Sequence, residues 1–242
     1  MQIFNPLEKF SLRNVTAAFS RRQDGNMSLS FGNTADSLVN RKEFLLQVDI
    51  NYNDLICAKQ VHGVNIEYVL GKDKSSGALD YASSIEDADG LITDQPNVPI
   101  AILTADCLSI FIYDPKRHAI AILHAGWRST EQNISSVGVS HLQDRFGSRM
   151  EDLQVGFGPS MRACCFEVEQ DFKSKFPFGL IKREGRVFMD MALINRRQLL
   201  DCGVKNENIF DPQICTFSDD DLFSFRKEGQ AAGRLISVAM LR

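Results

Sequence analysis

The sequence predicts an α+β fold, a single domain over residues 1–242 in which mixed β-sheets are flanked by helices. Three observations support this prediction. Segments typical of strands and of helices follow one another without a regular strand–helix–strand repeat. The 242 residues are 44% hydrophobic, so the chain can bury a large core. No internal repeat, low-complexity tract or linker composition divides the sequence.

The N-terminal part is predicted to form strands around one long helix. Residues 15–20 are apolar enough for a first strand. A helix is predicted over 36–48, because its apolar residues, Val39 and Leu46 among them, recur at roughly helical spacing. Short strands are expected at 56–58 and 65–70.

The middle of the sequence predicts consecutive buried strands. Residues 91–93 and 99–104 form the first two, and 108–113 and 119–123 are rich in β-branched and aromatic residues. The last two strands are joined by Asp114-Pro115-Lys116-Arg117, which has turn chemistry. We therefore expect 108–123 to be a β-hairpin.

The C-terminal part predicts helices and strands in mixed order. Asp190 can N-cap a helix and Gly203 can end it. The predicted elements are a helix at 134–146 closed by Gly147, a strand at 153–157, a helix that follows Val168 and ends near 176, a helix at 191–202, a loop that reaches Arg234, and a strand at 235–241.

Composition and charge argue against several classes of protein. The formal net charge of −4 does not favour nucleic-acid binding, which needs a basic face. No apolar run approaches the roughly 18 residues of a membrane span, and residues 1–9 lack the pattern of a signal peptide. The six cysteines are too sparse for a disulfide scaffold, so we expect reduced thiols in a cytoplasmic protein.

Cys107 and His124 flank the predicted hairpin. Cys107 enters its first strand and His124 leaves its second, so both are expected at the same end of the sheet. A thiol beside an imidazole suits a metal site or a thiolate nucleophile, whereas a cysteine that only packs in the core is the alternative. The polar neighbours Asp106 and Arg128 favour a functional site.

Two other polar stretches are open to more than one interpretation. His62 lies in Lys59-Gln60-Val61-His62-Gly63, and by itself it fits a surface turn. Asp87 and Asp89 precede a strand and fit turn chemistry, although two nearby carboxylates also suit acid–base catalysis or cation binding.

Five motifs that occur in order resemble the YfiH-like family, also called the multicopper polyphenol oxidase or laccase-domain family. The motifs are Gln60-Val61-His62-Gly63, Asp87-Ala88-Asp89-Gly90, Thr104-Ala105-Asp106-Cys107, His124-Ala125-Gly126-Trp127-Arg128, and Gly158-Pro159-Ser160 with Cys164-Cys165-Phe166-Glu167-Val168. The resemblance extends from Phe19-Ser20-Arg21-Arg22 to Phe223-Ser224-Phe225-Arg226 and Gly233-Arg234, nearly the whole chain.

The resemblance implies a YfiH-like cysteine hydrolase fold of α+β type and a metal site formed by His62, Cys107 and His124. It thereby favours a ligand role for His62 over a surface turn. Family members are described as containing zinc or copper. Their described activities are purine nucleoside phosphorolysis, adenosine deamination, phenol oxidation and editing of peptidoglycan precursors. The chain departs from the family pattern at 23–26, at Ser129 and at 161–163, which bears on the substrate more than on the metal.

Two imidazoles and a thiolate suit zinc and leave a fourth position open, as in catalytic zinc sites. Copper accepts the same ligands. Oxidation by several copper centres needs more ligands than four histidines supply, and His118 and His141 lie outside the motifs. Ligand number therefore argues against a laccase of that type.

Phosphorolysis needs cations for phosphate, and arginine binds phosphate oxygens in pairs. Arg22, Arg128 and Arg226 lie in or beside the motifs and are the candidates, with a surface position as the alternative for each. Asp106 is expected to orient a metal-bound histidine or to protonate a leaving purine.

The sequence and the resemblance together predict a zinc-dependent purine nucleoside phosphorylase, expected to be a monomer, that converts adenosine or inosine and phosphate into free base and ribose 1-phosphate. Adenosine deamination is a further expected activity. The alternatives are a Cys107–His124 hydrolase that edits peptidoglycan precursors, a copper-dependent polyphenol oxidase, and a non-enzymatic binding module stabilised by zinc.

Overall fold

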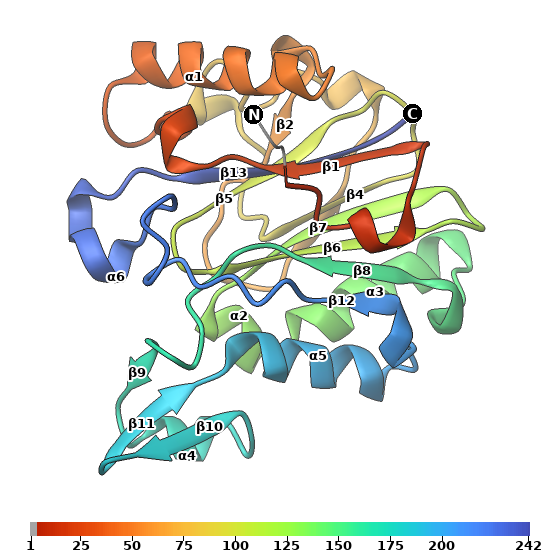
Figure 1. Cartoon of the computed structure of the whole chain (residues 1–242). Coiled ribbons are helices and arrows are strands. Elements are labelled where there is room, and N and C mark those ends of the chain that lie inside the picture. Colours follow the sequence, from red (N-terminus) through yellow and green to blue (C-terminus); the bar gives the residue numbers. More distant parts are fainter. Residues whose placement is uncertain (1–3) are drawn as a thin grey trace.

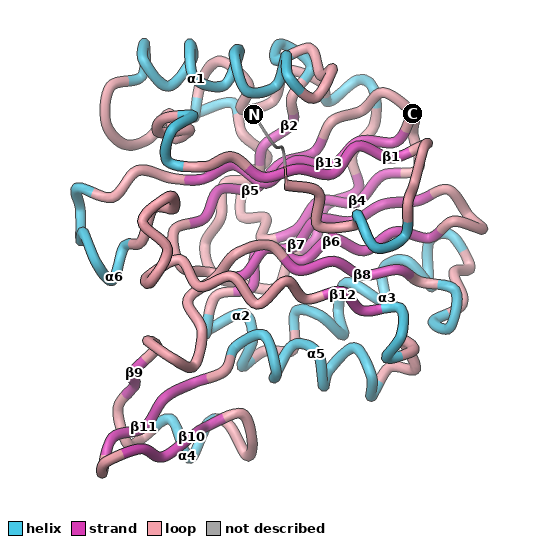
Figure 2. The backbone as a smooth tube through the Cα atoms, viewed as in Figure 1, coloured by secondary structure: helices cyan, strands magenta, loops and turns pink. Residues whose placement is uncertain are grey.

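Two β-sheets face each other in the centre of the structure, and helices cover the outer face of each (Figures 1 and 2). The structure is a computed structural model that describes residues 4–242. The first sheet has four strands, in the order β1 (Val15–Phe19), β13 (Leu235–Leu241), β5 (Ile100–Thr104) and β2 (Ile56–Cys57). The second has six, in the order β12 (Ile209–Phe210), β8 (Gln154–Phe157), β6 (Leu108–Asp114), β7 (Ala119–Ala125), β4 (Gly90–Thr93) and β3 (Ile66–Tyr68).

Both faces of the six-stranded sheet are buried, because successive side chains of a strand point to opposite faces. In β6, Ile110 and Ile112 pack toward helices α3 (Ile134–Phe146) and α5 (Met191–Asp201). Phe111 and Tyr113 of the same strand pack against the four-stranded sheet. This explains why the sequence of β6 is a continuous apolar run, which is typical of a strand buried on both sides.

Helix α1 (Thr34–Gln47) covers the outer face of the four-stranded sheet (Figure 1). It begins after Asn33, whose side-chain oxygen accepts a hydrogen bond from the N–H of Ala35. The predicted apolar stripe was partly wrong, since Val39 is 54% and Leu46 76% exposed. The helix packs instead through Phe44, Leu45 and their neighbours.

The hairpin prediction is confirmed. Strands β6 and β7 pair antiparallel, and the buried Asp114 stabilises the turn by accepting hydrogen bonds from the N–H groups of Lys116 and Arg117. Two helix ends are also as predicted: Gly147 closes α3 in the left-handed conformation and Asp190 caps α5.

Two C-terminal segments differ from expectation. A small sheet, in the order β10 (Leu180–Arg183), β11 (Arg186–Met189), β9 (Glu167–Val168), projects with α4 (Phe172–Lys175) from one end of the six-stranded sheet (Figure 1). The expected helix after Val168 is thus a single turn, and the loop expected to reach Arg234 begins with the 3₁₀ turn Gly229–Ala231, directly after α6 (Phe225–Glu228). Strands β10 and β11 form a local hairpin around Glu184-Gly185, and β11 also pairs with β9. Elements as short as these have weak signals in the sequence.

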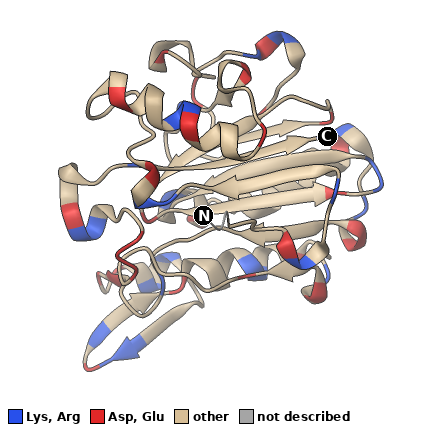
Figure 3. Cartoon of the chain, turned by 45° about the horizontal axis from the view of Figure 1, so that its top comes forward, with Lys and Arg blue, Asp and Glu red and all other residues tan. Residues whose placement is uncertain are grey.

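The remaining elements connect these layers. Helix α2 (Trp127–Glu131) directly follows β7. The 3₁₀ turns of the described residues are Glu8–Phe10, Arg22–Asp24, Tyr52–Asp54, Gly71–Asp73, Tyr81–Ser83, Met150–Asp152, Asn206–Asn208 and Gly229–Ala231. Charged side chains lie mainly on helices and loops, and the two large sheets carry few of them (Figure 3). Among residues 4–242, no helix has both the length and the apolar character needed to cross a membrane.

Candidate metal centre and pocket

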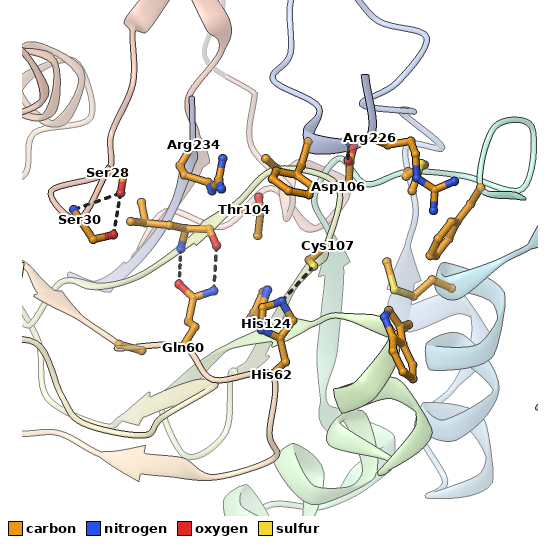
Figure 4. A pocket seen from close by; sticks show the side chains of 18 of the residues that line it. Ser28, Ser30, Gln60, His62, Thr104, Asp106, Cys107, His124, Arg226 and Arg234 are labelled. Atoms are coloured by element: carbon orange, nitrogen blue, oxygen red, sulfur yellow. Dashed lines mark hydrogen bonds between the residues drawn. The ribbon is translucent and has the colours of Figure 1, made fainter. Parts of the chain in front are cut away.

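The hairpin brings Cys107 and His124 to the same edge of the six-stranded sheet. Cys107 immediately precedes β6, and His124 pairs with Ser109 near the end of β7. His62 reaches the same place from the loop between β2 and β3 (Figure 4). One ligand atom from each of the three side chains lies within 4.8 Å of the other two, and the Cys107 sulfur is 4.0 Å from Nε2 of His62.

Asp89 organises both histidines. Its carboxylate is fully buried and accepts hydrogen bonds from the N–H groups of Val61 (3.1 Å), His62 (3.0 Å) and Gly63 (2.6 Å). It also accepts one from Nδ1 of His124, at 2.7 Å. The same side chain therefore fixes the loop that carries His62 and the orientation of the His124 ring, leaving Nε2 of His124 free to bind a metal.

The backbone around the centre is tightly constrained. His62 adopts a positive φ of 63°, a left-handed conformation that costs free energy for a residue with a side chain. A Cβ atom at Gly126 would lie 2.9 Å from Cδ2 of His62 and 3.2 Å from the Cys107 sulfur. Gly126 is therefore required so that the chain can pass beside both side chains.

The centre is strongly charged. Burial opposes ionisation of Cys107, but the neighbouring His124 and His62 outweigh it and lower the pKa of the thiol to about 6. Burial also disfavours a charged His124, yet Cys107 and Asp89 raise its pKa to about 9. Asp89 is itself buried, and its hydrogen bonds with His124, Gly63 and Val61 hold its pKa below the ordinary value.

The residues fit a metal ion by the chemistry of their donors. Two imidazoles and a thiolate form a common zinc ligand set, and the hydrogen bond to Asp89 is the usual support for a ligating histidine. His62 is exposed, Cys107 is half-buried and His124 is 3% exposed, so the centre opens to the surface on one side. The structure thus contains a candidate metal site, and its donor set does not specify the metal.

The three side chains line a pocket of about 410 Å³, within the usual range for small-molecule sites. Tyr81, Trp127, Phe166 and Phe225 contribute aromatic surface to its wall. Gln60, beside His62, exchanges two hydrogen bonds of 2.8 Å with the backbone of Leu103 and so ties the His62 loop to β5 (Figure 4).

Of the three predicted phosphate-binding arginines, only Arg226 lines the pocket. The guanidinium of Arg22 binds both carboxylate oxygens of Glu228, at 2.7 and 3.0 Å, and so already has an anionic partner. Arg128 is exposed and stacks on Trp127, with its guanidinium 4.2 Å from the ring centre. The prediction is corrected for these two residues.

Arg234 lines the pocket and was missed as a site residue, although it lies in a motif that carries the resemblance. Its guanidinium donates to the carbonyls of Ala232 and Gly233, and burial lowers its pKa although Cys107 and Asp106 oppose that shift. Within residues 4–242, neither Arg226 nor Arg234 has a carboxylate at salt-bridge distance. Both cations face the pocket (Figure 4).

Asp106 does not orient a histidine, and that expectation is corrected. One carboxylate oxygen accepts the hydroxyl of Thr216 and the other accepts the backbone N–H of Arg226, each at 2.7 Å. Asp106 therefore holds the first turn of α6, which carries Arg226, while Asp89 supports His124. The sequence did not predict the contact between Asp89 and His124, because Asp87 and Asp89 were interpreted as turn residues. A carboxylate in a turn gives no local sign of its distant partners.

Of the residues at which the chain departs from the family pattern, Met161 belongs to the pocket lining. The neighbouring Arg162 forms a salt bridge with Asp211. Ser129 is buried, and its hydroxyl has no hydrogen-bond partner among the described residues. Gln23, in the departure at 23–26, belongs to a 3₁₀ turn.

The fold and the site define the class of protein, an α+β protein with a candidate His₂Cys metal centre in the wall of a pocket. Residues 9–242 match the family described as multi-copper polyphenol oxidoreductase laccase, and the chain belongs to this family.

Named relatives are similar over most of the chain. "Purine nucleoside phosphorylase YlmD" of Geobacillus stearothermophilus is 32% identical over 223 residues, covering 88% of this chain and 81% of that protein. "Adenosine deaminase RL5" of an unknown prokaryotic organism is 28% identical, covering 80% and 78%. The crystal structure of the hypothetical protein YfiH of Bacillus licheniformis has a TM-score of 0.90 at 29% identity, covering 94% and 93%.

Proposed function

We propose that this chain is a purine nucleoside phosphorylase whose residues 1–242 act as one catalytic domain. Adenosine or inosine would react with phosphate to give the free base and ribose 1-phosphate. One observation carries the proposal. The same pocket is lined by a candidate metal-binding donor set and by two arginines that have no carboxylate partner within residues 4–242. The name of the relative from G. stearothermophilus supports the same activity.

The aromatic wall suits the purine. Tyr81, Trp127, Phe166 and Phe225 supply flat apolar surfaces on which a base can stack. Phe225 is 48% exposed although it is a large apolar side chain, which is expected of a residue that a substrate covers.

Arg226 and Arg234 suit the phosphate. A guanidinium binds two phosphate oxygens at once, and neither group is neutralised by a carboxylate of the described residues. Asp106 positions Arg226 through its backbone N–H. Arg226 also donates to the carbonyl of Glu167, which restricts the guanidinium near Phe166.

In the reaction, the bond between C1′ and the purine nitrogen breaks and a bond between C1′ and a phosphate oxygen forms. A proton must reach the leaving base, and a dihydrogen phosphate co-substrate can bring it to the site. Asp106, the carboxyl group of the pocket lining, accepts hydrogen bonds at both oxygens and so positions Arg226 instead. His62, Cys107 and His124 would hold zinc, with copper as the alternative ion. A bound ion of this kind supplies Lewis-acid polarisation of a substrate oxygen.

Adenosine deamination is a second candidate activity of the same pocket, favoured by the name of the relative RL5. A Cys107–His124 hydrolase acting on peptidoglycan precursors is favoured by the lowered pKa of Cys107, which would supply a thiolate. Metal content distinguishes this alternative, because a metal-bound sulfur is a poor nucleophile. Polyphenol oxidation is the least favoured, since His118 and His141 do not join the His62–His124 cluster.

The test is a screen of purine nucleosides with and without phosphate, together with metal analysis of the purified protein. We expect cleavage of inosine or adenosine only with phosphate, and ribose 1-phosphate as a product. Conversion of adenosine to inosine without phosphate would establish deamination. Cleavage that is equally fast in phosphate-free buffer would refute phosphorolysis, and hydrolysis of a muropeptide precursor by metal-free protein would establish the thiol mechanism.

A further inference from the structure

A second cluster of sulfur atoms lies outside the His62–Cys107–His124 centre. Cys164, Cys165 and Cys215 place their sulfurs within 4.8 Å of one another, and those of Cys164 and Cys165 are 3.4 Å apart. Cys164 is exposed, Cys165 is half-buried and Cys215 is buried. The cluster therefore reaches from the interior of the protein to the surface.

The backbone holds the two halves of this cluster together. Ser160 and Cys215 form a parallel bridge, in which the N–H of Ser160 donates to Ile214 and the N–H of Thr216 donates to Ser160. A salt bridge joins the same two segments: the guanidinium of Arg162, near Cys164, donates two hydrogen bonds, of 3.0 and 2.6 Å, to the carboxylate of Asp211, near Cys215. The convergence of the sulfurs therefore results from a fixed arrangement of two chain segments.

Hydrogen-bond donors surround the Cys215 sulfur. They are the N–H groups of Arg162 and Ser218 and the Ser218 hydroxyl. Donors directed at a sulfur in this way also stabilise a metal-bound thiolate.

We propose that Cys164, Cys165 and Cys215 form a second metal site, for a thiophilic d¹⁰ cation, Zn²⁺ or Cu⁺. Thiolate sulfurs are the ligands that both ions prefer. Zinc holds sulfurs at about 2.3 Å in a tetrahedron, which separates two of them by about 3.8 Å. That separation lies between the 3.4 Å and 4.8 Å of the cluster, so an ion fits with small side-chain movements.

A disulfide uses two of these sulfurs at about 2.05 Å and leaves the third without a partner. A metal ion uses all three.

The ion would connect the two segments that build one wall of the pocket. Met161 and Phe166 flank the cysteine pair and line the pocket. Thr216 follows Cys215 and donates its hydroxyl to Asp106. The ion would therefore stabilise this wall of the pocket, and the proposal is independent of the reaction that the pocket catalyses.

The test is metal binding by the full-length protein, loaded under reducing, oxygen-free conditions with Zn²⁺ in one arm and Cu⁺ in the other. After removal of excess metal, we expect about two ions per chain for the wild type and about one for C164S. C202S is the matched control, because Cys202 belongs to neither cluster, and it should retain about two. C107A should keep the second ion, whereas C107A/C164S should lose it.

Cobalt spectra of the wild type, compared with those of C164S, give a second measurement. Two loaded sites contain four thiolates and should give about four times the sulfur-to-cobalt charge-transfer absorption of the His62–Cys107–His124 site alone. Equal metal content of wild type and C164S, or a cobalt signal of one thiolate, would overturn the proposal. A disulfide between Cys215 and either neighbour, with only one ion bound after reduction, would overturn it in favour of a redox pair.

Discussion

Replacement of Asp89 by Asn is the sharpest test of how the metal centre is positioned. The Asp89 side chain accepts four hydrogen bonds, three from the backbone of the His62 loop and one from His124. Asparagine keeps one acceptor oxygen and turns the other position into a donor that faces N–H groups. If its oxygen faces Val61 and Gly63, the His124 proton must move to Nε2, which then cannot bind a metal.

With the amide oxygen toward Val61 and Gly63, D89N loses the hydrogen bond from His62 and reverses the one with His124; in the other orientation it loses the hydrogen bonds from Val61 and Gly63. Hydrogen bonds to charged groups contribute about 1.5–3 kcal/mol each, so the loss of one or two of them is roughly 1.5–6 kcal/mol. Loss of this kind of support typically lowers metal affinity or activity by about 10–100-fold. We expect both effects in D89N, together with a lower midpoint of thermal unfolding.

The assay is metal titration against a competing chelator, followed by kcat/KM of the metal-saturated protein. Asp87→Asn is the matched control, because Asp87 lies in the same motif, is exposed, and has a φ of 50° that asparagine tolerates well. Metal affinity and kcat/KM of D89N within about threefold of the D87N values would refute the reasoning, since supporting residues are expected to change both by about tenfold or more.

Three further predictions concern the same pocket. C107A should lose the ion of the His62–Cys107–His124 centre and its activity but keep a cooperative thermal transition, because the chain has a large core; an insoluble C107A would mean that this centre is structural. G126A should weaken metal binding about tenfold by displacing His62, and unchanged affinity in a metal titration would contradict the close contact of 2.9 Å. Arg234→Gln should raise the KM for phosphate about tenfold or more and leave that for nucleoside nearly unchanged, because its contacts are to the anion. Arg128→Gln is its control, and an equal effect of both variants in steady-state kinetics would refute the assignment of Arg234.

The sequence alone determined the parts of this protein that depend on neighbouring residues. The apolar runs of β6 and β7 and the turn chemistry at Asp114 specify a hairpin, because a short turn leaves its flanking strands only one way to pair. That local geometry already brings Cys107 and His124 to one edge. Motif resemblance added His62, which composition and spacing could not place.

Only the tertiary structure decided which polar groups meet. Asp89 and Asp106 both precede strands, yet one supports the two histidines and the other holds Arg226, because their partners lie far away in the chain. Arg234 reaches the pocket and Arg128 does not, since the direction of a long side chain depends on packing. The small sheet of β9, β10 and β11 escaped prediction although β10 and β11 form a local hairpin around Glu184-Gly185, because strands of two to four residues are too short to show a clear alternating pattern.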